Sequence, residues 1–332
     1  MNSRLNGRGL SPASLWGVAL LLAGLTGCAS GPLGGGFVPY DPMADVASSG
    51  KYEGPLIAPL AEDWSWSMPD TGHWVLSRME LGTPVVDGDR ILIGSSRSPG
   101  LFILERETGR VLRELETSGP VQAAPVRLEA GWLIADTFGE LQRLDEDFNP
   151  VWPAAFQAGA AVYRSPLVVG DGVFVSGGND TVYCVDLALG TVRWSFRREV
   201  PRGALELAIL GAPAPVLVGE EVVVGFSDGS ISGLDPAGGV ERWREQIGEG
   251  KFPDIQAEVL AGDGQFFAAA FGGPLVAFDV RSRAKNWTND QAGATSRIVR
   301  AGGLLFMTAV QGELLAIDAS TERVYCAGST MG

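Results

Sequence analysis

The sequence has little of the chemistry on which many enzymes depend. Among its 332 residues are one histidine, His73, and three widely separated cysteines. A histidine-rich zinc site or a Cys-x-x-Cys pair cannot be assembled from these residues. Lysine and arginine number 25 against 39 aspartates and glutamates, giving a formal net charge of −14. Because a phosphate backbone requires a basic surface, we expect no nucleic-acid partner.

Apolar residues and glycine are abundant instead. Hydrophobic residues make up 45% of the chain, which is ample for a core and excludes a wholly disordered protein. The 46 glycines indicate many turns.

The N-terminus is typical of a secreted protein. Arg4 and Arg8 precede an uncharged apolar run at residues 15–25, which is shorter than the roughly 20 residues that a membrane-spanning helix needs. The run therefore indicates a secretory signal. No other stretch of the chain combines such length and apolarity.

The signal ends in Leu25-Thr26-Gly27-Cys28, which resembles the lipobox of bacterial lipoproteins. The resemblance implies cleavage before Cys28 and lipidation of that residue. The alternative is an ordinary signal with a chance cysteine. Ala29 stands where inner-membrane lipoproteins carry aspartate, which favours the periplasmic face of the outer membrane. We predict a signal peptide at 1–27 and a lipidated, flexible, Gly- and Pro-rich tether at 28–61.

Beyond residue 80 the chain repeats. Each unit opens with an apolar run after proline or a small residue, and glycine- and aspartate-rich turns separate further short strands. An acidic residue closes the third strand of each unit at Glu105, Asp145, Asp186, Asp235, Asp279 and Asp318. We interpret these acids as turn-forming residues rather than as metal ligands or general acids.

A fourth strand follows each acidic residue and is centred on an aromatic side chain in most units: Trp152, Trp194, Trp243 and Trp287. Arg113 and Cys326 take this place in the first and last units. The tryptophans could form a ligand-stacking array, but their repeated position favours packing between units.

Six units of about 41 residues with four strands each predict an all-β β-propeller over residues 62–328. The stretch from Asp186 to Trp194 resembles the repeat of quinoprotein-type propellers. The segment Trp64-Ser65-Trp66-Ser67-Met68 resembles an orphan fourth strand. We expect it to close the ring by pairing with the last blade, which would remove exposed sheet edges.

The order of lipobox, tether, tryptophan-containing segment and quinoprotein-type repeats resembles the BamB-type lipoproteins of the outer-membrane β-barrel assembly machinery. The resemblance implies a non-enzymatic scaffold that docks on the periplasmic domains of the barrel-forming core subunit. It also implies eight blades. Since six complete units are present, the ring is either shorter or lacks two blades.

Two segments resemble the docking surface of that family. Residues 207–215 match its segment between the third and fourth repeats, and Asp254-Ile255-Gln256 matches an Asp-x-Asp pair before the fifth. Leu210 replaces an arginine of the family, and Gln256 replaces its second aspartate. The partner-binding residues implied are Leu207, Ile209, Leu210, Asp254 and Gln256. The three apolar residues could instead be a buried blade edge.

Two other functions compete with the scaffold. A sugar- or peptidoglycan-binding or sensing lipoprotein would use Trp74 or Trp132 on an exposed face. A quinoprotein-like dehydrogenase would need a disulfide between adjacent cysteines, which this sequence does not contain. We therefore predict no enzyme activity, no catalytic residue, no metal and no cofactor. The lone His73 is expected to be a surface or packing residue.

Cys184 and Cys326 are expected to stay unpaired. They fall three units apart and would lie nearly opposite in a six-unit ring, whereas a disulfide needs Cα atoms within about 7 Å.

Overall fold

The computed structural model describes residues 62–68, 82–199, 212–250, 252–294, 297–309 and 312–329, with the backbone alone for 326–329. Twenty-four β-strands in six four-stranded sheets make up the regular structure of these residues. No helix among them is long and apolar enough to cross a membrane.

The strands of the first three sheets are β1 Val85–Asp87, β2 Arg90–Gly94, β3 Pro99–Glu105, β4 Val111–Pro120, β5 Val126–Arg127, β6 Trp132–Ala135, β7 Glu140–Leu144, β8 Phe156–Gln157, β9 Leu167–Val169, β10 Gly172–Gly177, β11 Thr181–Asp186 and β12 Val192–Arg197. Those of the last three are β13 Val216–Val218, β14 Glu221–Gly225, β15 Ser230–Leu234, β16 Glu241–Gln246, β17 Leu260–Gly262, β18 Gln265–Ala269, β19 Leu275–Asp279, β20 Lys285–Asn289, β21 Val299–Ala301, β22 Leu304–Thr308, β23 Glu313–Asp318 and β24 Val324–Ser329.

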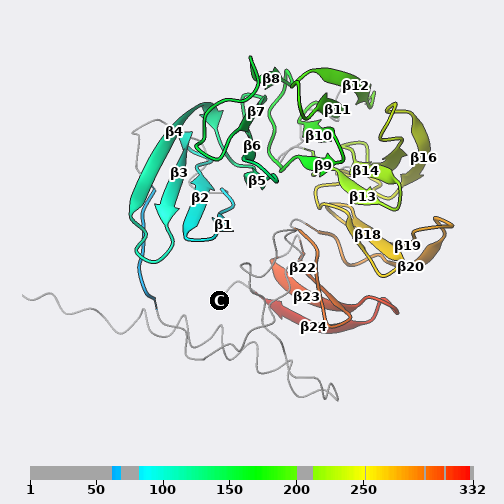
Figure 1. The fold of residues 1–332 in the computed structure, drawn as a ribbon. Helices are drawn as coiled ribbons and strands as arrows, with labels where there is room; N and C mark the ends of the chain where they lie inside the picture. The colour runs from blue at the N-terminus through cyan, green and yellow to red at the C-terminus, as the bar shows by residue number, and fades with distance from the viewer. Residues whose placement is uncertain are drawn as a thin grey trace, which may run out of the picture.

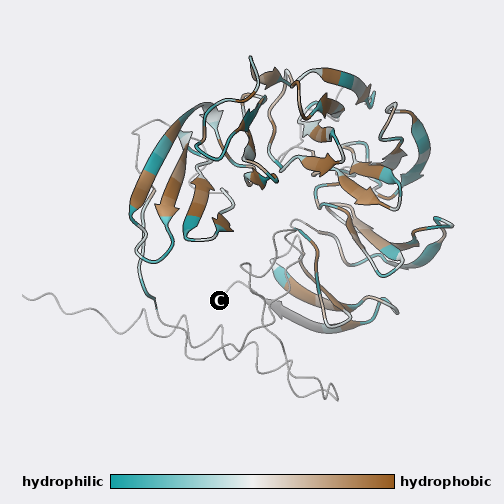
Figure 2. Cartoon of the chain, viewed as in Figure 1, coloured by the Kyte–Doolittle hydropathy of each residue, from teal (hydrophilic) through white to brown (hydrophobic). Residues whose placement is uncertain are grey.

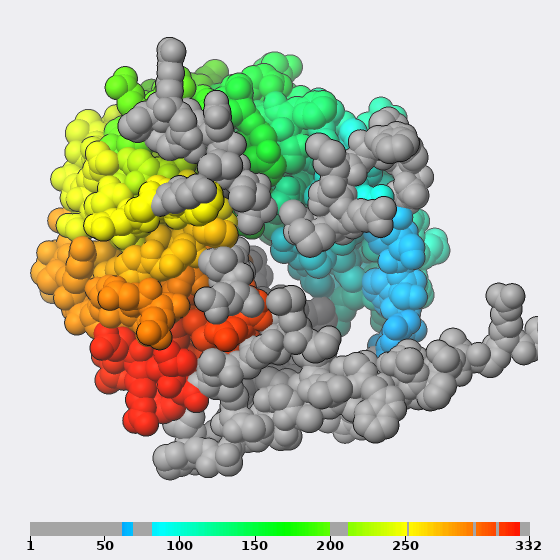
Figure 3. All heavy atoms as spheres, turned by 180° about the vertical axis from the view of Figure 1, so that it is seen from behind, coloured from blue at the N-terminus to red at the C-terminus, as the bar shows by residue number. Residues whose placement is uncertain are grey.

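Each sheet is an antiparallel meander of four consecutive strands. The sheets follow one another in chain order around a common centre, with the first strand of each innermost and the fourth outermost (Figure 1). The same succession is visible from behind (Figure 3). The predicted β-propeller of six four-stranded blades is therefore confirmed.

The core lies between neighbouring sheets, because side chains alternate between the two faces of each strand. In β10, Val173 and Val175 pack with the second sheet, whereas Phe174 packs with the fourth. All residues of β10 are buried, whereas the outer strand β12 is largely exposed. Figure 2 colours the inner strands mainly as hydrophobic and the outer strands partly as hydrophilic.

The acidic residues form turns, as predicted. The Asp186 carboxylate accepts hydrogen bonds from the amides of Ala188 and Leu189, both at 2.9 Å. Asp279 and Asp318 bind the amides two and three residues further on in the same way. The Arg193 guanidinium, together with these amides, lowers the pKa of Asp186. Hydrogen bonds from the hydroxyl and amide of Ser320 lower the pKa of Asp318, and those from the amide and hydroxyl of Ser282 lower that of Asp279.

The tryptophans join neighbouring sheets, which confirms their packing role. Trp152, Trp194 and Trp287 each donate an indole N–H to a backbone carbonyl of the next sheet, at 2.9–3.0 Å. In each pair the accepting residue directly follows the acidic residue of that sheet: Leu187, Pro236 and Ala319. Arg113 of the first sheet likewise donates to a turn carbonyl of the second, that of Asp147.

The second unit differs from its prediction. Its fourth strand is only β8, and Trp152 lies before that strand. Pro150 and Pro153 flank this stretch, and proline has no N–H to donate to a neighbouring strand. Before β8, the stretch pairs with β7 only through an isolated bridge between Pro150 and Leu144 and the bond from the Val151 amide to the Arg143 carbonyl, at 2.9 Å.

The N-terminal segment 62–68 contains no strand residue. Trp64 nevertheless donates its indole N–H to the carbonyl of Arg106 in the first sheet, at 2.9 Å, and Trp66 packs 5.1 Å from the Phe102 ring. Arg106 directly follows the acidic Glu105, so the Trp64 hydrogen bond is equivalent to those made by Trp152, Trp194 and Trp287. The sixth sheet takes its fourth strand from β24, so closure of the ring by the N-terminal segment stays a prediction.

Cys184 is free and buried, in agreement with the prediction. Burial raises the pKa of its thiol to about 11. The side chain of Cys326 lies outside the described part of the chain.

Candidate functional site

The expected docking surface lies on the connections between the third and fourth sheets and between the fourth and fifth. Residues 200–211 are outside the described residues, and with them Leu207, Ile209 and Leu210. Asp254 and Gln256 lie on the second connection, between β16 and β17.

This second connection is held between two hairpins. The amide of Ile255 donates to the carbonyl of Phe226, at 3.1 Å, in the β14–β15 turn, and Ile255 forms an isolated bridge with Ala270 beyond β18. The Ile255 side chain packs directly over Gly225, where a Cβ would lie 2.3 Å from its Cγ2 atom. The fourth and fifth sheets together therefore fix residues 254–256.

The structure buries both polar side chains of this segment. Asp254 is 7% exposed and Gln256 4% exposed, and Oε1 of Gln256 has no hydrogen-bond partner. A partner-binding carboxylate is expected on the exposed surface, whereas the structure buries Asp254. Burial raises the pKa of Asp254 to about 6, with a further contribution from the charge of Asp180.

Asp180 is a site residue that sequence reasoning missed. It follows β10 with a left-handed φ of 57° and is 4% exposed. Its carboxylate accepts hydrogen bonds from the amide and the hydroxyl of Ser227, at 2.9 and 2.5 Å, which link the third sheet to the fourth. The Asn179-Asp180 pair in a glycine-containing turn signals left-handed backbone, but nothing local in sequence signals a buried carboxyl.

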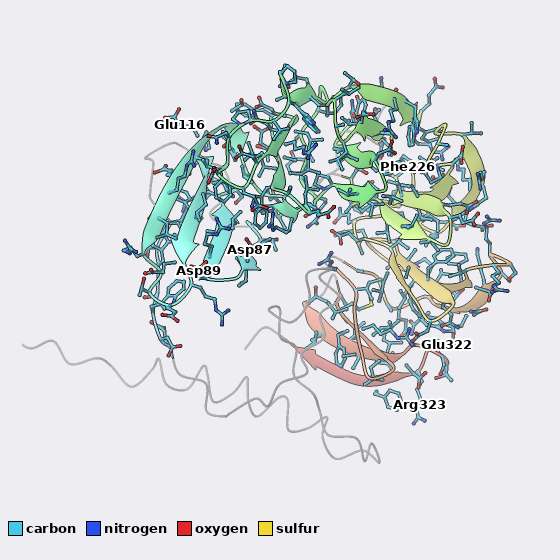
Figure 4. All side chains as sticks on the ribbon, in the orientation of Figure 1. Asp87, Asp89, Glu116, Phe226, Glu322 and Arg323 are labelled. Carbon is cyan, nitrogen blue, oxygen red and sulfur yellow. The ribbon has the colours of Figure 1, made fainter. Side chains whose placement is uncertain are left out.

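Arg198, the cation near Asp180, already pairs with other carboxylates. Arg198 is 9% exposed and lies over the Phe226 ring at 4.8 Å, at the junction of the third and fourth sheets where Figure 4 labels Phe226. Its guanidinium pairs with Glu241 and, at 3.7 Å, with Asp228. Arg198 lowers the pKa of Asp180, but burial dominates and the pKa is raised.

Two aromatic residues neighbour the backbone of Asp254. The amide of Phe271 donates to the carbonyl of Asp254, at 2.9 Å, and the Phe271 ring meets that of Phe252 edge to face at 6.5 Å. Phe252 is 38% exposed. An exposed aromatic ring is suited to contact with a protein partner. In the described residues no three His, Cys, Asp or Glu side chains are grouped as a metal site would need.

Trp132 does not stand on an exposed face. Its side chain is fully buried in β6 between the first and second sheets, and it stacks with Phe148 at 6.3 Å. The expectation that it could hold a sugar is therefore wrong. Trp74 and His73 lie outside the described residues.

Comparison with protein families gives a match over most of the chain. The family described as outer membrane protein assembly factor BamB matches residues 63–326. The chain belongs to this family. The match runs from the Trp64 segment to the fourth strand of the sixth sheet and so covers all six sheets.

Individual BamB relatives are distant. The BamB of Moranella endobia is 26% identical over 163 residues, which are 47% of this chain and 41% of that protein. The BamB of Nitrosomonas eutropha is 22% identical over 84% of this chain and 68% of its own length. The crystal structure of BamB from Moraxella catarrhalis superimposes with a TM-score of 0.65 at 17% identity, covering 75% of each chain, and shows the common fold.

Proposed function

We propose that this protein is a non-enzymatic scaffold subunit that assists the assembly and insertion of β-barrel proteins into the outer membrane. It would do so by docking on the periplasmic domains of the barrel-forming core subunit. The family match over residues 63–326 carries this proposal. The junction of the third, fourth and fifth sheets supports it, because it offers an exposed aromatic ring and buried carboxylates at the predicted docking position.

We also propose that the protein is anchored by lipid on the periplasmic face of the outer membrane. It comprises a signal peptide at 1–27, a tether at 28–61 and the propeller at 62–328. The Leu25-Thr26-Gly27-Cys28 sequence supports the anchor. Several acyl chains on one residue hold a protein essentially permanently, since each buried methylene contributes about 0.8 kcal/mol.

Cys28→Ala is expected to release the protein from membranes, because it removes the only site for the acyl chains that this anchor uses. Fractionation of the cell envelope and mass spectrometry of the purified N-terminus measure this. Cys184→Ala is the matched control, since Cys184 is buried inside the propeller. A wild-type protein that starts elsewhere, with a free Cys28 thiol, would contradict the anchor.

Leu207→Asp combined with Ile209→Asp is expected to abolish co-purification of the barrel-forming core subunit from detergent-solubilised envelopes. Carboxylates in the apolar centre of an interface lose apolar contact and leave charge unpaired, and single central residues commonly contribute about 2 kcal/mol or more. The β-sheet circular-dichroism spectrum should stay unchanged.

The matched control is Leu189→Asp combined with Val240→Asp, because these aliphatic residues are 64% and 65% exposed on turns at the other end of the blades. The control should co-purify the core subunit like wild type. Retention by the first double variant would show the docking assignment to be wrong, and unfolding would show that Leu207 and Ile209 are core residues. Absence of the core subunit from the wild-type preparation would contradict the proposed function itself.

A further inference from the structure

A pocket of about 210 Å³ lies at the turns of the sixth sheet, beside the fifth. Its lining includes Arg300 of β21, the turn residues Gly303 and Ala319, and Gln265, the first residue of β18. Asp318, the turn acid of the sixth sheet, also lines it. The pocket therefore brings a guanidinium, an amide side chain and a carboxylate to one small volume.

The second sheet shows what such an arrangement holds. There the carboxylate of Glu146 accepts a hydrogen bond from the Arg127 guanidinium at 2.9 Å and another from the Gly131 amide at 3.0 Å. Both hydrogen bonds lower the pKa of Glu146, and the charge of Arg90 in the first sheet contributes further. A guanidinium and a backbone amide that converge on one point thus form a receptor for a carboxylate.

Both donors of this receptor have counterparts at the pocket. Arg300 is the second residue of β21, as Arg127 is of β5, and the two side chains are 26% and 25% exposed. Gly303 directly precedes β22, as Gly131 precedes β6, and their φ angles are 83° and 94°. The sixth sheet therefore repeats the guanidinium and the amide of the second.

The acceptor is what differs between the two sheets. Glu146 directly follows the turn acid Asp145, whereas the residue that directly follows Asp318 is Ala319. The methyl group of an alanine cannot accept a hydrogen bond, and it is shorter than a glutamate side chain by a carboxylate and a methylene. The pocket thus lies where the second sheet has its carboxylate.

The two donors remain available in the sixth sheet. Arg127 pairs with Asp87 of the preceding sheet as well as with Glu146. Among the described residues Arg300 pairs only with Asp263 of the preceding sheet, at 2.8 Å. The Gly303 carbonyl accepts a hydrogen bond from the amide of Ala319, but its own amide donates to no backbone group of the described chain.

We propose that this pocket binds a small carboxylate of the amino-acid class. The ligand carboxylate lies between the Arg300 guanidinium and the Gly303 amide, in the place that Glu146 holds in the second sheet. The ligand amino group faces Asp318, which supplies the opposite charge. Asp318 also disfavours phosphate and sulfate, since these carry more negative charge than a carboxylate. The inference is independent of the proposed function, because no residue of the pocket belongs to the docking segments.

The first test is titration of the full-length protein in detergent with glycine, followed by the NMR signal of the Gly303 amide. We expect a saturable shift of this signal. Acetate, which lacks the amino group, should bind several-fold more weakly, and glycinamide, which lacks the carboxylate, should not shift the signal.

Arg300→Gln should raise the dissociation constant for glycine by about tenfold or more, because a charge-assisted hydrogen bond is lost. Arg281→Gln is the matched control. It also removes one guanidinium, but Arg281 is exposed on the turn of the fifth sheet and does not line the pocket. The control should bind glycine like wild type.

Ala319→Glu supplies the carboxylate from the chain itself. It should abolish glycine binding and, without any ligand, move the Gly303 amide signal toward its position in the glycine-saturated wild type. If this variant does not fold, Arg300→Gln and its control decide the question.

Three results would overturn the inference, and each would leave the proposed function untouched. The first is the absence of a saturable Gly303 shift with glycine, and the second is wild-type affinity of Arg300→Gln. The third is equal binding of chloride and glycine, which would show an unspecific anion effect.

Discussion

Trp152→Ala is expected to lower the free energy of unfolding by about 3–5 kcal/mol, the range for truncating a buried tryptophan. The side chain is 2% exposed and packs with Leu133 and Val173 between the second and third sheets. Its indole N–H donates to the Leu187 carbonyl at 3.0 Å. Truncation would leave both a cavity and an unpaired carbonyl. Urea denaturation followed by circular dichroism measures the change.

Two further variants separate these contributions. Trp152→Phe keeps a ring but loses the hydrogen bond, and it should cost less than the alanine variant. Leu189→Ala, at a position 64% exposed on the adjoining turn, should change stability by less than about 0.5 kcal/mol. A loss below about 1 kcal/mol for Trp152→Ala would contradict the role of this side chain in joining the sheets.

Gly239→Val is expected to destabilise the protein by about 3 kcal/mol or more. Gly239 has a φ of 69°, which a β-branched residue adopts only with strain, and an added Cβ would lie 2.5 Å from the Trp194 ring. The variant would therefore strain its own turn and displace the tryptophan that joins the third and fourth sheets. Thermal and urea unfolding measure the loss.

In the sixth sheet the equivalent position is not glycine, so the opposite substitution can be tested there. Glu322 stands at the same place of its turn with a φ of 63°, beside Arg323 (Figure 4). Since glycine adopts this conformation without strain, Glu322→Gly should stabilise the protein by up to about 1 kcal/mol. A loss of stability from Glu322→Gly equal to that from Gly239→Val would show that backbone strain does not explain either effect.

The sheets were predictable from sequence because their determinants are local. The turn acids bind amides two and three residues away, and the repeat sets the position of each tryptophan. The predicted fourth strand centred on Trp152 was wrong in the second unit, because Pro150 and Pro153 prevent regular pairing there. Trp132 was misjudged because a strand buried on both faces has no polar alternation to mark its orientation.

The candidate site was less predictable because it depends on contacts between sheets. The resemblance located Asp254 and Gln256, but their burial follows from how the hairpins of the fourth and fifth sheets enclose residues 254–256. Asp180 lies 74 positions earlier in the sequence, yet its charge contributes to the raised pKa of Asp254. No short-range pattern encodes such an interaction, because it arises only once three sheets are placed side by side.

The indole-to-carbonyl hydrogen bond between consecutive sheets has a consequence for the evolution of such a chain. Each bond involves a sheet and the one after it and no third sheet. A chain built on nearest-neighbour joints behaves as a one-dimensional array, in which the stability of a unit depends on itself and its two flanks. Gain or loss of a whole unit then leaves every other joint intact. Substitutions in one unit can therefore accumulate without changing the stability of units further along the chain. This is consistent with a fold shared at 17% sequence identity.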